Sequence, residues 1–226
     1  MQTKKAIQVG DCILDGKHIY IQSMLNTRSD DIVGSVAQAV ALEQAGCEIL
    51  RAAIPDKEAL KLIPAIKEAV SIPLVADIHF DYRLALEAVA AGIDKIRINP
   101  GNIGGMDRVK QVVKACQSRN IPIRIGVNSG SLEKDLLAKY GAPTAPALVE
   151  SAMRHVKMLE DCDFTDIVIS MKSSTVSTMI DAYRLAAQQC DYPLHLGVTE
   201  AGTAHMGLIK SAIGIGALLH DGIGAT

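Results

Sequence analysis

The sequence of 226 residues contains no tryptophan and only two phenylalanines, yet 49% of its residues are hydrophobic. Its core must therefore be built mainly from aliphatic side chains, as is typical of α/β barrels and doubly wound sheets. No apolar run comes near the roughly 18 residues that a membrane-spanning helix requires. We therefore expect a cytoplasmic protein with no membrane partner.

The sequence also lacks a strong charge of either sign and any ordered pattern of cysteines. The formal net charge is −2, which gives no general attraction to nucleic acid, so any affinity for phosphate would have to be local. The cysteines stand far apart and form no Cys-x-x-Cys motif and no close Cys/His pair; they are Cys12, Cys47, Cys116, Cys162 and Cys190. We therefore expect reduced, mostly buried thiols, and neither a disulfide framework nor a metal site.

What the sequence does contain is a repeat of short apolar runs, spaced so that one strand and one helix fit each interval. The seven runs span residues 19–24, 48–54, 73–78, 95–100, 122–127, 166–171 and 193–198. Several begin at a proline, which the first residue of a strand tolerates. A longer interval after the fifth run predicts an insertion over residues 129–146.

Helical spacing is visible between the runs. Asp30 is placed to cap a helix with Ile32, Val36, Ala39 and Val40 on its inner face. Comparable spacing recurs at Val109, Val112, Val113 and Cys116, at Val149, Met153 and Val156, and over residues 205–219. Strands that alternate with helices pair in parallel, so the expected fold is an α/β, TIM-type (β/α) barrel with seven visible units.

The expected domain organisation is one substrate-binding barrel domain over residues 1–226. Residues 6–14 form a hairpin that closes the lower mouth, and residues 19–226 form the barrel itself. An eighth unit would begin where the sequence stops. Because eight strands close such a barrel, the rhythm favours the front part of a longer protein over an open barrel of seven units.

Polar residues stand at or just past the ends of the runs, and parallel strands bring all such ends to one face. They are Gln22, Ser23, Arg51, Asp77, His79, Arg97, Asn99, Arg124, Asn128, Lys172 and Glu200. Arginine binds phosphate with two parallel hydrogen bonds, so we interpret this face as a site for a phosphorylated ligand. The alternative for each arginine is a partly buried ion pair with an acid on a neighbouring strand.

Three features leave the chemistry open. Asp77 and His79 share one face of a strand, so they could form an acid/base pair, two ligands of a divalent metal, or a hydrogen bond that only supports packing. The segments 100–105 and 129–131 could present backbone N–H groups to an anion or be plain helix-entry turns. Lys172 could form a Schiff base with a carbonyl substrate, as in an aldolase, or simply contact phosphate.

At this level of detail the chain resembles the 4-hydroxy-3-methylbut-2-enyl-diphosphate synthase family, iron-sulfur enzymes of non-mevalonate isoprenoid biosynthesis. The segments that carry the resemblance cover nearly the whole chain in order: 21–24, 50–56, 73–80, 95–104, 122–132, 169–173, 193–202 and 221–224. The resemblance implies an oxidoreductase that opens the ring of 2-C-methyl-D-erythritol 2,4-cyclodiphosphate reductively.

The resemblance also assigns roles to individual residues. It implies that Arg51, Arg97, Arg124 and Lys172 contact the diphosphate. It implies that further polar residues bind the substrate or line its cavity, namely Gln22, Ser23, Asp77, His79, Asn99, Asn128 and Ser173. Asp77, His79 and Glu200 are the candidates for catalysis, and no residue is expected to bind a metal.

The family's cofactor is a 4Fe-4S cluster held by three cysteines and a glutamate in a C-terminal domain, with flavodoxin or ferredoxin as the electron donor. The resemblance implies a homodimer in which that domain closes over the partner's barrel. This chain departs from the family pattern because it contains neither the eighth strand nor the cluster domain, and Ala225 replaces a usual acidic residue. We therefore expect residues 1–226 to bind no cluster and to be inactive alone.

Two alternatives remain at this stage. The first is an unrelated aldolase-like or pteroate-synthase-like barrel, in which Lys172 or Asp77 performs the chemistry on a phosphorylated substrate. The second is a catalytically silent binding module.

Overall fold

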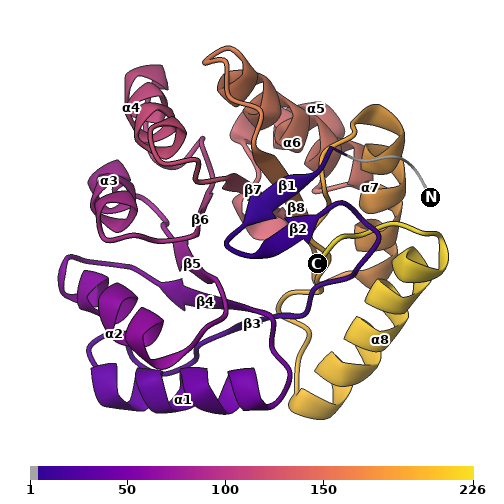
Figure 1. Ribbon diagram of the computed structural model, residues 1–226. Coiled ribbons are helices and arrows are strands. Elements are labelled where there is room, and N and C mark those ends of the chain that lie inside the picture. The colour runs from indigo at the N-terminus through magenta and orange to yellow at the C-terminus, as the bar shows by residue number, and fades with distance from the viewer. Residues whose placement is uncertain (1–4) are drawn as a thin grey trace.

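The computed structural model describes residues 5–226, and the start of the chain, residues 1–4, lies outside that range. Strands and helices alternate along the described chain (Figure 1). The strands are β1 (Ile7–Val9), β2 (Cys12–Leu14), β3 (Gln22–Met24), β4 (Ile49–Ala53), β5 (Leu74–Asp77), β6 (Lys95–Ile98), β7 (Ile123–Asn128) and β8 (Ile167–Lys172). The α-helices are α1 (Ile32–Gln44), α2 (Leu62–Ala69), α3 (Tyr82–Ala90), α4 (Met106–Gln117), α5 (Lys134–Tyr140), α6 (Ala145–Glu160), α7 (Val176–Gln189) and α8 (Ala204–His220). Two short 3-10 helices, η1 (Glu58–Lys61) and η2 (Ser129–Ser131), complete the order.

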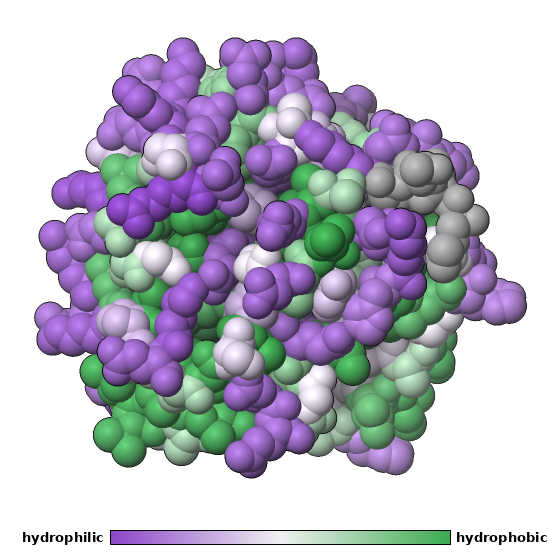
Figure 2. Space-filling model, in the orientation of Figure 1, coloured by the Kyte–Doolittle hydropathy of each residue, from purple (hydrophilic) through white to green (hydrophobic). Residues whose placement is uncertain are grey.

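Strands β3 to β8 form one parallel sheet in chain order, with the helices arranged around its outside (Figure 1). Six of the seven predicted runs thus contain a strand. This arrangement confirms the predicted α/β, TIM-type barrel architecture. Figure 2 shows apolar surface towards the bottom of the same view, over α1 and α8, whose exposed residues include Val33, Leu208 and Ile213.

The predicted seventh strand is wrong as a continuous element. Run 193–198 forms only an isolated bridge between Leu194 and Ile169 of β8. On its other side, its backbone hydrogen bonds within residues 5–226 go to Ala225 and Thr226: Ala225 N to Leu194 O at 2.9 Å and Leu196 N to Thr226 O at 2.8 Å. A ladder this short does not define a strand, although the backbone still follows the course that the sequence predicted.

The ring of backbone hydrogen bonds closes at Ala225. Its carbonyl oxygen accepts a bond from Tyr20 N at 3.1 Å, just before β3. Residues 225–226 therefore lie between run 193–198 and the start of β3, where an eighth strand of a barrel belongs.

Residues along each strand alternate between the helices and the barrel interior. Ile96 and Ile98 of β6 pack in the main core against the helices. The interior has its own apolar layer at one end, where Ile7, Val9, Cys12 and Leu14 of the β1–β2 hairpin pack on Ile49, Val75, Val168 and Ala225. Strands β1 and β2 pair antiparallel as a hairpin, which lies across one end of the barrel (Figure 1).

Helix α1 begins one residue later than predicted. Asp31, not Asp30, caps it by accepting a hydrogen bond from Gly34 N at 2.8 Å. Asp30 instead pairs with Arg28. The predicted insertion contains η2, α5 and the first two residues of α6.

Candidate functional site

The interior above the apolar layer is polar and carries a concentration of basic side chains. Arg51, Arg97, Arg124 and Lys172 come from the neighbouring strands β4, β6, β7 and β8, and Asp77 from β5 lies among them. We call these five residues the basic cluster. Its members face inward because each alternates with residues that pack against the helices, such as Ile96, Ile98, Ile123 and Ile125.

Asp77 is the acid at the centre of the basic cluster. Arg51 Nη2 donates to its Oδ2, and Arg97 Nη1 donates to its Oδ1 at 3.1 Å. Burial alone would raise the pKa of Asp77, but the guanidinium groups of Arg51 and Arg97 outweigh burial and lower the pKa to about 2. The carboxylate therefore stays ionised at neutral pH and holds both arginines in place.

Arg124 has no such acid. Its side chain is completely buried, and its Nε and Nη1 atoms have no hydrogen-bond partner among residues 5–226. Arg51 Nε lacks a partner in the same way. Unpaired buried donors are rare in proteins, because each loses its bonds to water without replacement. Donors of this kind are suited to an anion that is not part of the chain.

Lys172 and Lys95 add to the positive charge. Burial, followed by the charges of Arg124, Arg51 and Arg97, lowers the pKa of Lys172 to about 7. Lys95 is completely buried below the cluster, and its Nζ donates to Gln22 Oε1 at 3.4 Å. Its pKa is lowered by burial first and by Arg124 next. One carboxylate thus faces three guanidinium and two amine groups.

A cavity of about 370 Å³ lies beside the cluster. Gln22, Lys172 and His195 line its polar side, while Ile215 and Leu219 of α8 line its apolar side. Lys172 therefore connects the basic cluster to a space that a small ligand could enter.

Most of the other predicted site residues surround the cluster. His79 Nε2 lies 3.0 Å from Asp77 Oδ2, and the side chain is about half exposed. In the amide orientation that gives both its oxygen and its nitrogen a hydrogen-bond partner, Asn128 Oδ1 accepts a bond from Arg97 Nη2 at 3.2 Å. Asn99 is buried and stands one residue past β6, two residues after Arg97.

The remaining predicted residues lie apart from the cluster. Ser23 is paired in register with Leu50, which packs in the main core, so Ser23 faces the helices. Ser173 Oγ accepts a bond from Thr175 N at the entry to α7. Glu200 is exposed, has a φ of 49°, and forms no hydrogen bond or ion pair with the cluster among residues 5–226.

Two buried residues were missed from the sequence. Lys95 begins its strand, and only its alternation with Arg97 indicates that it faces the interior. His195 is buried within an apolar run, and its Nδ1 lies 2.6 Å from Thr226 Oγ1. Burial, followed by Arg124, Lys172 and Lys95, lowers the pKa of His195. In both cases, the sequence indicated the buried position only by placing a polar residue among the apolar residues of a predicted strand.

The cysteines of the described chain form no ligand set, although Cys12 and Cys47 line the same pocket. Cys12, Cys47 and Cys116 are buried, and burial raises the pKa of Cys116 to about 12. Within residues 5–226, no three His, Cys, Asp or Glu side chains form a group that could hold a metal ion. The same part of the chain contains no helix suited to span a membrane.

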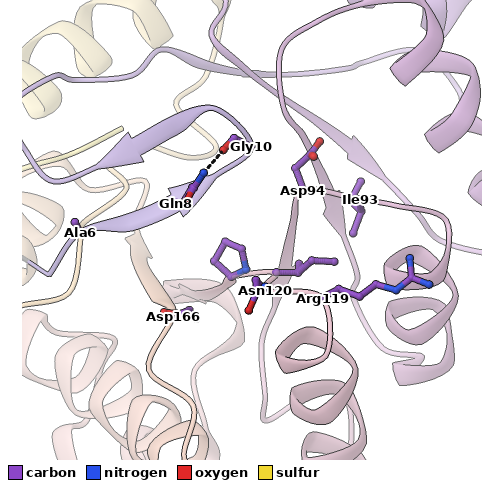
Figure 3. Close-up of a pocket in the computed structure, with 10 residues that line it drawn as sticks. Ala6, Gln8, Gly10, Ile93, Asp94, Arg119, Asn120 and Asp166 are labelled. Carbon is purple, nitrogen blue, oxygen red and sulfur yellow. Dashed lines mark hydrogen bonds between the residues drawn. The ribbon is translucent and has the colours of Figure 1, made fainter.

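A second cavity, of about 550 Å³, opens beside the β1–β2 hairpin (Figure 3). Gln8, Asp94, Arg119 and Asn120 are among its lining residues. Asp94 already pairs with Lys67 at 2.6 Å and accepts a bond from Leu74 N. This second cavity lies at the hairpin end of the barrel, away from the strand ends that carry the basic cluster. The buried donors without partners belong to Arg51 and Arg124 of the cluster. The basic cluster is therefore the better candidate site.

Structures of known proteins share this fold at low sequence identity. The dihydropteroate synthase of Xanthomonas albilineans superimposes with a TM-score of 0.67 at 13% identity, covering 99% of this chain and 91% of that one. A phosphonopyruvate hydrolase superimposes with a TM-score of 0.58 at 16% identity, covering 92% and 74% respectively. At these identities the likeness shows a barrel fold alone.

Similarity in sequence is much closer to another group of proteins. The 4-hydroxy-3-methylbut-2-en-1-yl diphosphate synthase (flavodoxin) of Clostridium perfringens is 60% identical over 226 residues, which are 100% of this chain and 64% of that protein. The protein of the same name from Listeria monocytogenes is 55% identical, over 100% of this chain and 61% of its own length. The GcpE TIM-barrel domain matches residues 4–226. This chain therefore belongs to the GcpE TIM-barrel family.

Proposed function

We propose that this chain is the substrate-binding barrel of a 4-hydroxy-3-methylbut-2-enyl-diphosphate synthase. Its basic cluster would hold the diphosphate of 2-C-methyl-D-erythritol 2,4-cyclodiphosphate. The observation that carries this proposal is Arg124, a buried guanidinium with two unpaired nitrogens in a cluster that contains a single carboxylate. The names of the relatives, 55–60% identical to this chain, support the same reaction.

The residues divide the work by their chemistry. Arg51, Arg97, Arg124 and Lys172 supply positive charge and donors to the two phosphate groups. Asp77, whose pKa is lowered to about 2, orients Arg51 and Arg97 and does not donate a proton at neutral pH.

The reaction converts the cyclic diphosphate into the linear hydroxymethylbutenyl diphosphate. It takes up two electrons and two protons, breaks one carbon–oxygen bond to phosphate and releases one water. His79 lies at the accessible edge of the cluster against Asp77, where it could transfer a proton.

The described residues do not fit a 4Fe-4S cluster, because no suitable group of ligands exists among them. We propose that the ligands of the cluster lie in the part of the relatives that this chain does not span. The chain matches only 60–64% of their length. We further propose flavodoxin or ferredoxin as the electron donor, a homodimer as the assembly and the cytoplasm as the location.

Isothermal titration of the 226-residue chain with the cyclic diphosphate tests this proposal. Binding should weaken as salt increases, and Arg124→Ala should weaken it by roughly 1.5–3 kcal/mol for a lost charge-assisted contact. Arg119→Ala is the matched control, because Arg119 lines the cavity beside the hairpin. Equal affinities of the wild type and Arg124→Ala would remove the argument from the basic cluster.

A further inference from the structure

The insertion between β7 and α6 is tied to α6 by hydrogen bonds to Glu133. Glu133, immediately before α5, accepts a bond from His155 Nε2 at 3.0 Å and from Ser151 Oγ at 2.7 Å. Ser151 and His155 stand four residues apart in α6 and so share one face of that helix. Both are at most 2% exposed.

The carboxylate of Glu133 is ionised. Burial would raise its pKa, but the hydrogen bonds from His155 and Ser151 outweigh burial and lower the pKa to about 2. The interaction therefore fixes the His155 ring against the protein interior with a charge-assisted bond.

The loop that follows β6 lies directly against this ring. A Cβ atom at Gly101 would be 3.1 Å from His155 Nε2 and 3.4 Å from Asn99 Oδ1. Such contacts are tighter than nearly all real Cβ contacts. The absence of a side chain at Gly101 thus lets the loop backbone rest on the imidazole.

Gly101 in turn orients a residue beside the basic cluster. Its N–H donates to Asn99 Oδ1 at 3.1 Å, which fixes the rotation of the Asn99 amide. Within residues 5–226, Asn99 Nδ2 donates to no other group of the chain. Asn99 stands one residue past β6 and two residues after Arg97, so continued alternation of the strand would place this donor on the side of the basic cluster.

We propose, on the basis of the diphosphate site described above, that Glu133 and His155 are positioning residues that fix the Asn99 amide for the diphosphate. Glu133 holds His155, His155 supports Gly101, and Gly101 sets the direction of the Asn99 Nδ2 donor. The insertion is therefore a support for the loop after β6, and it serves ligand binding without touching the ligand.

A double-mutant cycle in the intact enzyme tests this assignment, with the cyclic diphosphate as the probe. Asn99→Ala and His155→Ala should each weaken binding about fivefold, the size expected for one hydrogen bond. If His155 acts through Asn99, the double variant should bind no more weakly than Asn99→Ala alone. His155→Gln, which keeps a donor towards Glu133, should recover part of the affinity.

The matched control is Glu150→Ala. Glu150 of α6 also holds α5, through Lys139 and Tyr140, but among residues 5–226 it forms no hydrogen bond or ion pair with the loop after β6. This variant should lower the unfolding temperature while leaving the affinity unchanged. Glu133→Ala should lower both.

Two results would overturn the assignment. One is wild-type affinity in Glu133→Ala and in both His155 variants, while Asn99→Ala binds weakly. The other is a double variant whose loss equals the product of the two single losses, since His155 would then act independently of Asn99. Absence of binding by the wild type is a distinguishable result, because it would overturn the diphosphate site itself.

Discussion

Gly126 of β7 leaves the space that the Arg97 guanidinium occupies. A Cβ atom at Gly126 would overlap Arg97 Nε and lie 2.8 Å from Arg97 Cζ. Arg97 Nη2 also donates to the carbonyl oxygen of Gly126 at 3.4 Å. The direction of a proposed phosphate-binding arginine is therefore set by a missing side chain on the neighbouring strand.

Gly126→Ala should displace Arg97 from Asp77 and weaken binding of the cyclic diphosphate. The expected loss is roughly 1.5–3 kcal/mol for the misplaced charge-assisted contact, together with about 1–3 kcal/mol of stability for the overpacked interior. Titration calorimetry and thermal unfolding measure the two effects. Gly216→Ala in α8 is the control, because a Cβ there meets nothing within 4 Å. Unchanged affinity in Gly126→Ala would show that Arg97 does not contact the ligand.

The affinity for the cyclic diphosphate should fall as the pH rises above about 7. The pKa of Lys172 is lowered to about 7 by burial and by the nearby arginines, so the free protein loses this positive charge above that pH. A bound anion favours the protonated form of the Lys172 amine. Above about pH 7, binding therefore requires the protein to take up a proton, and the affinity falls by up to tenfold for each further pH unit. Each phosphorus atom of the cyclic diphosphate carries a single, strongly acidic hydroxyl group. The charge of the ligand therefore stays constant over this pH range.

Lys172→Arg separates this effect from other titrations. Arginine remains protonated throughout the range, so the variant should bind with little pH dependence between about pH 6 and 9. Calorimetry in buffers of different ionisation enthalpy counts the protons directly. A wild-type affinity that is constant with pH would contradict the assignment of Lys172 as a titrating ligand contact.

Lys172 should form no Schiff base. A lysine with a lowered pKa is also the group that an aldolase-like enzyme uses, so the two interpretations of Lys172 differ in covalent chemistry. Borohydride treatment with carbonyl compounds should leave the mass of the peptide containing Lys172 unchanged. A reduced adduct mapped to Lys172 would favour the aldolase-like alternative.

The chain of 226 residues should neither assemble a 4Fe-4S cluster nor reduce the cyclic diphosphate by itself. A cluster needs about four ligands brought together, and within residues 5–226 no three His, Cys, Asp or Glu side chains form a group that could hold a metal ion. Anaerobic reconstitution with iron and sulfide, followed by absorption spectroscopy, checks the first statement. Dithionite assays with and without the remaining part of the protein check the second. Stoichiometric cluster incorporation into residues 1–226 would place the chemistry in the barrel.

The sequence was sufficient to predict the basic cluster because parallel strands end on one face. Arg51, Arg97, Arg124 and Lys172 each stand at the end of an apolar run, and the structure brings them together. The pairing of both Arg51 and Arg97 with Asp77 could not be predicted, since it depends on distances between three strands.

The inward face of the shortest strand of the barrel, β3, could not be predicted from the sequence. A strand of three residues is too short for the alternation of side chains to show which residues face the barrel interior. For β3, this is determined by its register with β4, in which Gln22 pairs with Ile49. Ser23 was therefore grouped with the wrong face of the sheet. Lys95 was missed because a lysine at the start of a strand usually reaches solvent, whereas the hairpin covers this one.

The five residues of the basic cluster all stand on strands β4 to β8, which continuous parallel ladders join. Hydrogen bonds in the core strands of a sheet open less readily than those of loops. Amide hydrogen exchange at these five positions should therefore be slow, and the charges of the cluster should keep their spacing while the surrounding loops move.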